Sequence, residues 1–246
     1  MTTYNLELMQ ALVSERSSAS DIAGIIRHDI AMSAKILQLV NSAFFNHATK
    51  ISTIEQAVVQ LGLQMVKNLA LSVKVFQDSR VTRITQGFSI EAASNHAFHT
   101  AAVARQLVTD HSLAEDAFMA GMLHDIGKLI LAEKLPDKFS AVRYLATTEQ
   151  IPVHVAERQL LGITHAEIGG YLLGIWGLPY PIVKAVTNHH EPSRVPERTE
   201  SGILEAVFVA NCLVNEAEID EDYLEEIGMQ DKVQTWREMT SESEMA

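Results

Sequence analysis

Histidine is frequent in this chain, with 10 histidines among 246 residues. Several stand at spacings, or beside an acidic residue, that suit metal binding. His96 and His99 are three residues apart, so one helix would present both imidazoles on the same side. Imidazole and carboxylate together bind borderline divalent cations such as iron, manganese, nickel or zinc. The candidate ligands are His96, His99, His124, Asp125, His165, His189 and His190.

The His124-Asp125 pair carries the strongest signal because of the residues around it. It lies inside the apolar run AGMLHDIGKLI, where a buried carboxylate costs free energy unless it has a partner. Gly121 and Gly127 flank the pair and would let neighbouring helices approach closely. A single histidine on a helix is more often a core or surface residue, so the prediction of a metal site rests on the joint pattern. We assign His28, His47, His111 and His154 to surface or capping roles.

The segments that must position these side chains are predicted to be helical. Apolar residues recur at helical spacing along nearly the whole chain, and no alternating strand pattern exceeds a few residues. The pattern predicts a helix over 91–110 that turns and returns as a second helix over 113–131. An antiparallel hairpin with arms of similar length would bring His124 and Asp125 close to His96.

Capping motifs predict where other helices begin. Ser52–Glu55 and Thr164–Glu167 both have the spacing of a capping box. The second motif places His165 at the start of a helix. His189 and His190 follow an apolar helical segment and precede Pro192, so we expect them at a helix end.

The composition is that of a globular protein, with 47% apolar and 20% charged residues. No segment reaches the roughly 18 to 20 uninterrupted apolar residues that a membrane span needs. The N-terminus lacks the basic and apolar regions of a secretion signal. Cys212 is the only cysteine, which excludes an intrachain disulfide and a thiolate zinc cluster. We therefore expect a cytoplasmic protein that does not interact with a membrane.

The net charge of −12 is concentrated at the C-terminal end. Residues 201–246 contain 12 acidic residues and only 2 basic ones, which leaves the rest of the chain nearly neutral. A direct nucleic-acid surface needs a basic stripe, so this distribution argues against one. We expect residues 218–246 to form a solvated acidic tail.

Several segments resemble known motifs. GMLHDIGK (121–128) resembles the motif that names the HD superfamily of metal-dependent phosphohydrolases, and the residues from His96 to Leu107 resemble its first histidine motif. THAEIGGYLLGIWGLP (164–179) and AVTNHHEP (185–192) are more particular. Together with segments 21–45 and 51–62, they resemble the HDOD family, a bacterial signalling domain related to HD-GYP phosphodiesterases. The resemblance extends from residue 5 to about residue 215.

The helical pattern and this resemblance together predict the architecture. We expect an all-α protein, a two-lobed helical bundle with an HD-domain-like C-terminal lobe. Residues 1–80 would form the N-terminal lobe, residues 81–217 the HD-like lobe, and residues 218–246 the acidic tail.

The resemblance also implies a set of metal ligands. The active HD phosphohydrolases bind metal at the positions of His96, His124, Asp125 and a late aspartate, and the HD-GYP enzymes add further histidines. His99 is the alternative to His96 if the helix is rotated by one turn. The added histidines correspond to His165, His189 and His190.

In active relatives a metal-activated water attacks a phosphoester. Asp125 and Lys128 are then the catalytic candidates, with Lys128 holding a phosphate as a point charge. The other interpretation of Lys128 is a solvated lysine near a helix end.

Two departures from the family pattern weaken the enzyme hypothesis. The late aspartate expected within AVFVANCLV (206–214) is replaced by Asn211, which removes a negative charge and a good hard-metal ligand. The chain reads HHEPSRVP where HD-GYP enzymes carry their GYP signature. HDOD domains are also regarded as lacking demonstrated hydrolytic activity.

These observations favour a signal-transduction protein that acts through signalling proteins or a small-molecule or nucleotide ligand, with a metal in its HD-type pocket. The alternative is a metal-dependent phosphohydrolase acting on a nucleotide or cyclic dinucleotide. A third hypothesis is a structural scaffold whose histidines only satisfy one another. The sequence specifies no oligomeric state.

Overall fold

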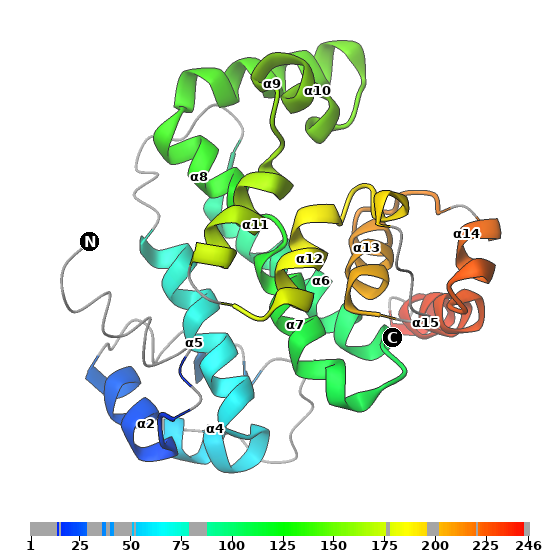
Figure 1. The fold of residues 1–246 in the computed structure, drawn as a ribbon. Coiled ribbons are helices and arrows are strands. Elements are labelled where there is room, and N and C mark those ends of the chain that lie inside the picture. The colour runs from blue at the N-terminus through cyan, green and yellow to red at the C-terminus, as the bar shows by residue number, and fades with distance from the viewer. Residues whose placement is uncertain are drawn as a thin grey trace. The chain divides into compact units, whose positions relative to one another are not determined.

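Helices account for all the regular structure in the described part of the chain, which confirms the all-α prediction (Figure 1). The computed structural model describes residues 14, 16–28, 36–37, 40–41, 51, 53–78, 88–175, 178–195, 202–219 and 221–243. The chain divides into two compact units, residues 1–80 and residues 81–246.

The first unit contains α2 (Ala19–His28), α4 (Ile54–Leu61) and α5 (Leu63–Asp78), which pack against one another. The capping box of α4 is shifted by one residue from the predicted Ser52–Glu55 pair. Thr53 has an extended backbone conformation. Its side-chain oxygen accepts a hydrogen bond from the Gln56 backbone N–H, and its own backbone N–H donates to the Gln56 side-chain oxygen. A glutamine serves as well as a glutamate in this motif, so the sequence pattern alone fits either register.

The second unit carries all the candidate ligands. Its helices are α6 (Ile90–Leu107), α7 (Ala114–Leu123), α8 (Ile126–Lys134), α9 (Pro136–Glu149), α10 (Val153–Leu161), α11 (His165–Ile175), α12 (Tyr180–Asn188), α13 (Ile203–Val214), α14 (Glu221–Glu226) and α15 (Gln230–Ser243), with short 3₁₀ turns at His111–Leu113 and Pro192–Arg194. Helix α7 is almost wholly buried and packs against α6, α12 and α13. Helix α11 packs against α8 and α12.

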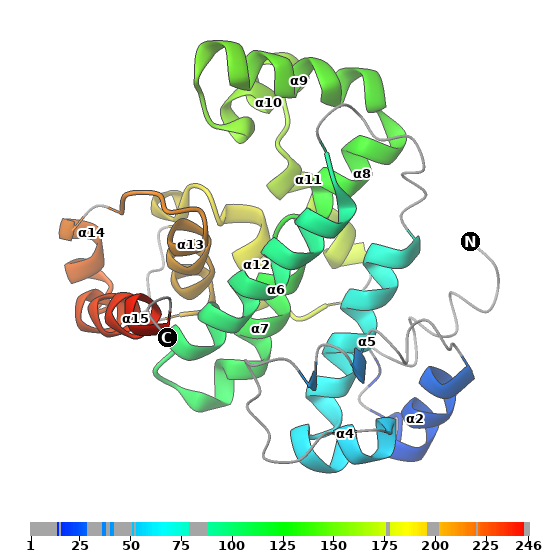
Figure 2. The ribbon, with the colours of Figure 1, turned by 180° about the vertical axis from the view of Figure 1, so that it is seen from behind.

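The antiparallel hairpin predicted for the first two ligand-bearing helices is present as α6 and α7 (Figure 2). Its second arm differs from the prediction of one helix over 113–131, because the structure breaks this segment at His124 and Asp125. The His124 ring bonds the carbonyl oxygen of Gly121, and Asp125 leaves the helical conformation with φ −99° and ψ 10°. The break lets two adjacent side chains enter the same interior space.

Close helix contacts around this break depend on the two flanking glycines. A Cβ atom on Gly121 would lie 2.5 Å from the Cα atom of Ala101 in α6. A Cβ atom on Gly127 would lie 1.9 Å from the carbonyl oxygen of His165 at the start of α11. The glycines therefore set the separations at which α6 and α11 approach the His124-Asp125 pair.

The C-terminal segment corrects one expectation. Residues 218–246 are predicted to form a solvated tail, but most of this segment forms α14 and α15. Leu224, Met229 and Val233 are buried, and the Lys232 ammonium bonds the carbonyl oxygen of Leu107. Apolar side chains at helical spacing pack this segment onto the second unit, while acidic residues such as Glu225 remain exposed.

Within the residues that the structure describes, no helix is long and apolar enough to cross a membrane.

The contact at Gly127 gives a first prediction. We expect Gly127→Ala to destabilise the protein by about 3 kcal/mol or more, because the added methyl group would overlap backbone atoms of His165 that cannot rotate away. Gly174→Ala, in α11, is the matched control, since no described atom lies within 4 Å of its added Cβ. The control should be neutral or stabilising by about 0.5–1 kcal/mol. Urea unfolding of both variants would test this, and equal stabilities would contradict it.

Candidate metal centre

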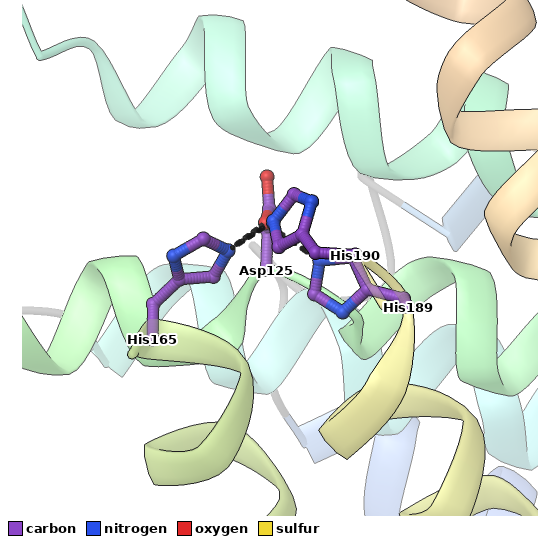
Figure 3. Close-up of side chains that lie close together, drawn as sticks. All are labelled: Asp125, His165, His189 and His190. Carbon is purple, nitrogen blue, oxygen red and sulfur yellow. Dashed lines mark hydrogen bonds and ion pairs between the residues drawn. The ribbon is translucent and has the colours of Figure 1, made fainter. Parts of the chain in front are cut away.

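The fold gathers into one cluster the six histidine and aspartate ligands that this chain retains of the seven positions implied by the family resemblance. His96 comes from α6, and His124 and Asp125 come from the break between α7 and α8. His165 is the first residue of α11, and His189 and His190 directly follow α12. Figure 3 shows four of these side chains converging from three parts of the chain.

One group of ligand atoms surrounds the Oδ1 atom of Asp125. The Nε2 atoms of His165 and His189 lie 3.1 Å and 3.7 Å from it. The Nε2 atom of His190 lies 3.0 Å from that of His165. The ligand atoms of these four residues lie within 4.8 Å of one another, close enough to bind a single cation.

A second group surrounds the Oδ2 atom of the same carboxylate. The Nε2 atoms of His124 and His96 lie 3.4 Å and 3.8 Å from it, and 3.2 Å from each other. His99 is exposed and belongs to neither group, so of the two alternatives His96 is the one that lies in the cluster.

Hydrogen bonds at the far side of the rings determine which nitrogen faces the cluster. His124 Nδ1 lies 2.7 Å from the Gly121 oxygen, and His189 Nδ1 lies 2.8 Å from the Val186 oxygen. His165 Nδ1 lies 2.7 Å from the Glu157 carboxylate. Each acceptor requires a proton on Nδ1, which leaves the Nε2 lone pair of the ring directed at Asp125.

With His165 neutral and protonated on Nδ1, this arrangement leaves buried lone pairs without a protein donor. Asp125 Oδ1 and His189 Nε2 are both buried and have no hydrogen-bond partner. Unsatisfied buried acceptors are costly, and acceptors that face one another are worse. A divalent cation bound between them would remove the penalty, so the residues present fit a metal ion.

The electrostatics of the cluster favour neutral imidazoles at His96, His189 and His190. Burial, and next to it the neighbouring His124, lower the pKa of His96 to about 4. Burial also lowers the pKa values of His189 and His190. Burial disfavours protonation of His165 too, but the Asp125 and Glu157 carboxylates, which accept hydrogen bonds from the protonated ring, raise its pKa above the ordinary value. Neutral imidazoles are the form that binds a metal.

The charge on Asp125 is also favoured. Burial works against ionisation of this carboxyl, but His124 and Lys128 hold its pKa well below the usual range. The Lys128 ammonium lies 2.6 Å from Asp125 Oδ2. Lys128 is therefore an ion-pair partner within the cluster and not a solvated helix-end lysine.

Asn211, the residue in place of the expected aspartate, faces the second group. Its Oδ1 atom lies 3.1 Å from His96 Nε2 and accepts a hydrogen bond from the Asn215 side chain at 2.8 Å. The position is retained in space, but the negative charge is lost.

Two residues near the cluster were not identified from the sequence as part of it. Glu157 is fully buried and orients His165, although it lies in a different helix. His154, assigned above to a surface or capping role, is half-buried and stacks on His190 at 4.1 Å. Both lie on α10, whose position relative to α11 and α12 depends on tertiary packing. His111 is exposed as expected, and the side chains of His28 and His47 lie outside the described residues.

Residues 1–192 match the HDOD domain family. The chain belongs to the HDOD family. This finding agrees with the resemblance of the histidine motifs and with the helical architecture.

Two solved structures share the fold of this HDOD chain, and one further relative is similar in sequence. A protein from Shewanella amazonensis whose suggested class is phosphohydrolase has 25% identity and a TM-score of 0.76, with 96% of this chain and 89% of that chain covered. An HDOD domain protein of unknown function from Geobacter sulfurreducens has 23% identity and a TM-score of 0.71, covering 88% and 73%. An uncharacterized protein from Treponema pallidum is 29% identical over 214 residues, and the match spans 85% of this chain and 40% of that relative.

The buried Glu157–His165 pair gives a second prediction. We expect Glu157→Gln to weaken metal binding by roughly 10- to 100-fold, because a neutral amide holds the Nδ1 proton of His165 less strongly and lowers the basicity of Nε2. The measurement is the dissociation constant for Zn²⁺ in competition with a chromophoric chelator. Glu133→Gln is the control, since the carboxylate of Glu133 pairs with Lys134 instead of a histidine. Equal affinities in the two variants would contradict the role of Glu157.

Proposed function

We propose that this HDOD chain is a signal-transduction domain whose HD-type pocket holds a divalent cation, and that it acts by binding a protein or small ligand. The observation that carries the proposal is the pair of buried, unpartnered acceptor atoms on Asp125 and His189. A purely structural histidine cluster would pair these atoms with donors, because burial of unmade hydrogen bonds is costly. This argues against the scaffold hypothesis.

The residues that would hold the cation are those around Asp125 Oδ1. His165, His189 and His190 would each contribute an Nε2 lone pair, and Asp125 would contribute the negative charge. Three imidazoles and one carboxylate suit iron, manganese, nickel or zinc better than magnesium or calcium. When bound, such a cation supplies Lewis acidity and lowers the pKa of a coordinated water.

The protein's own groups prepare this site in advance. Glu157 holds the proton on the Nδ1 atom of His165, and the Val186 carbonyl does the same for His189. The stacked ring of His154 restricts the orientation of His190. Ligands that are already oriented lose little conformational freedom on binding, which favours retention of the metal.

Two features favour regulation over hydrolysis. Asn211 supplies no negative charge to the second group, and Lys128 is engaged by Asp125 instead of facing an open phosphate position. The pocket beside His190, which Arg158, Thr187 and Arg194 also line, has a volume of about 40 Å³. That volume holds a few water molecules.

A metal-dependent phosphohydrolase is the second candidate. It is supported by the six clustered histidine and aspartate ligands and by the 25% identity to the Shewanella amazonensis protein whose suggested class is phosphohydrolase. In that function Lys128 would leave Asp125 and bind a phosphate oxygen of a nucleotide.

Metal content tests the proposal directly. We expect untagged protein to contain at least about one equivalent of iron, manganese, nickel or zinc by elemental mass spectrometry. His189→Ala and Asp125→Ala should reduce the content, because one removes an oriented ligand ring and the other the only carboxylate of both groups. His111→Ala, an exposed histidine on a 3₁₀ turn, is the control and should retain the metal.

Two outcomes would decide against the proposal. A metal content below about a tenth of an equivalent after anaerobic reconstitution would mean that the protein has no metal centre. Hydrolysis of a phosphodiester or a cyclic dinucleotide by metal-loaded protein, lost in Asp125→Ala, would favour the phosphohydrolase. We expect no such hydrolysis above the level of the Asp125→Ala protein.

A further inference from the structure

The two sides of the Asp125 carboxylate differ in how well they are satisfied. Oδ1 is buried without a hydrogen-bond partner, and so is His189 Nε2, 3.7 Å away. Oδ2 instead has a donor, because the Lys128 ammonium lies 2.6 Å from it. Ligand atoms surround both oxygens, but only the Oδ1 side has unmet acceptors.

The position of Lys128 follows from local helix geometry. Lys128 lies in the first turn of α8, three residues after Asp125, and its backbone N–H donates to the Asp125 carbonyl oxygen at 2.9 Å. The Lys128 side chain is only 25% exposed. A charge-assisted hydrogen bond of this length within one helical turn holds the ammonium at Oδ2.

The remaining atoms on the Oδ2 side complete a hydrogen-bond network. His124 Nε2 is an acceptor, because the Nδ1–H of this ring donates to Gly121. His96 Nε2, at 3.2 Å from His124 Nε2 and 3.1 Å from Asn211 Oδ1, can serve as the donor to both. The Asn215 amide also donates to Asn211 Oδ1. No acceptor on this side requires an added cation.

The charges point the same way. Asp125 is the only carboxylate in the two ligand groups, and Asn211 adds no charge. Two divalent cations beside a fixed ammonium would repel one another with a single carboxylate between them, and such repulsion is strong where water is excluded. The cluster is therefore better matched to one divalent cation together with one ammonium.

We propose that the Lys128 ammonium occupies the position of a second cation, so that this centre holds one metal ion on the Oδ1 side of Asp125. The inference rests on the proposed function, since it requires that the centre bind metal at all. It assigns His165, His189 and His190 to the metal, and His96 and His124 to the network around Lys128.

The stoichiometry of metal binding tests this assignment. Chelator-treated protein would be equilibrated with Zn²⁺, and separately with Mn²⁺, by dialysis, and the bound metal counted by elemental mass spectrometry. We expect about one equivalent in the wild type and about two in Lys128→Met, with the second ion bound at least about tenfold more tightly in the variant than in the wild type. Lys134→Met is the matched control on the same helix, because its ammonium pairs with Glu133 and not with a ligand. The control should bind about one equivalent.

A second variant guards against loss of folding. Lys128→Gln removes the charge but keeps a hydrogen-bond donor, and circular dichroism melting would establish that each variant is folded. Adding Asn211→Asp to Lys128→Met should tighten the second ion further, since it restores a carboxylate beside His96.

The possible results separate the two proposals. Two equivalents in the wild type, or one equivalent in both folded Lys128 variants, would overturn the role of Lys128 while leaving the metal centre in place. No metal in the wild type would overturn the proposed function, and the inference with it.

Discussion

The buried carboxylate of Asp125 is the constraint on which the rest of this centre depends. A negative charge in the interior is tolerated only when cations or donors surround it. Here the neighbours are Lys128 at 2.6 Å on one oxygen and the Nε2 atoms of four histidines at distances of 3.1 to 3.8 Å. The break between α7 and α8 places this side chain among them. The apolar periodicity predicts one continuous helix through His124 and Asp125. In such a helix the backbone at these two residues would follow a different path through the cluster.

A layer of outer hydrogen bonds gives the inner ligands their chemical character. The acceptors behind His124, His165 and His189 are two backbone carbonyl groups and the Glu157 carboxylate. Because each accepts a hydrogen bond from an Nδ1–H group, the Nε2 lone pairs of the rings converge on one space before any ligand is present. The cost is visible in the unpartnered atoms of Asp125 and His189. The retention of such unsatisfied groups indicates selection for binding at the expense of stability.

The ligands come from segments that are far apart in the sequence, so a bound cation would couple their positions. His165 begins α11, His189 and His190 follow α12, and Asp125 precedes α8. A cation that binds only the folded arrangement stabilises it by mass action. Occupancy of the centre would then determine how rigidly these helices are held, and under the proposed signalling role this would give the domain a physical means of response without hydrolysis. The neutral Asn211 and the ion-paired Lys128 fit this role better than catalysis at a two-metal site.

The sequence by itself determined the helical class, the family motifs and the candidate ligands. Apolar periodicity and capping signals are local, and the cost of burying the His124-Asp125 pair can be judged from its immediate neighbours. Only the tertiary structure placed His96 in the cluster and left His99 exposed. It also brought Glu157 against His165 and divided the ligands between the two oxygens of Asp125. The packing of α14 and α15 likewise followed from the tertiary structure. His96 and Asn211 are in contact although 115 residues separate them. Such contacts depend on how whole helices pack and on the close approaches that Gly121 and Gly127 permit. They also depend on which hydrogen bonds the packing leaves unmade. No local sequence pattern specifies how distant helices pack.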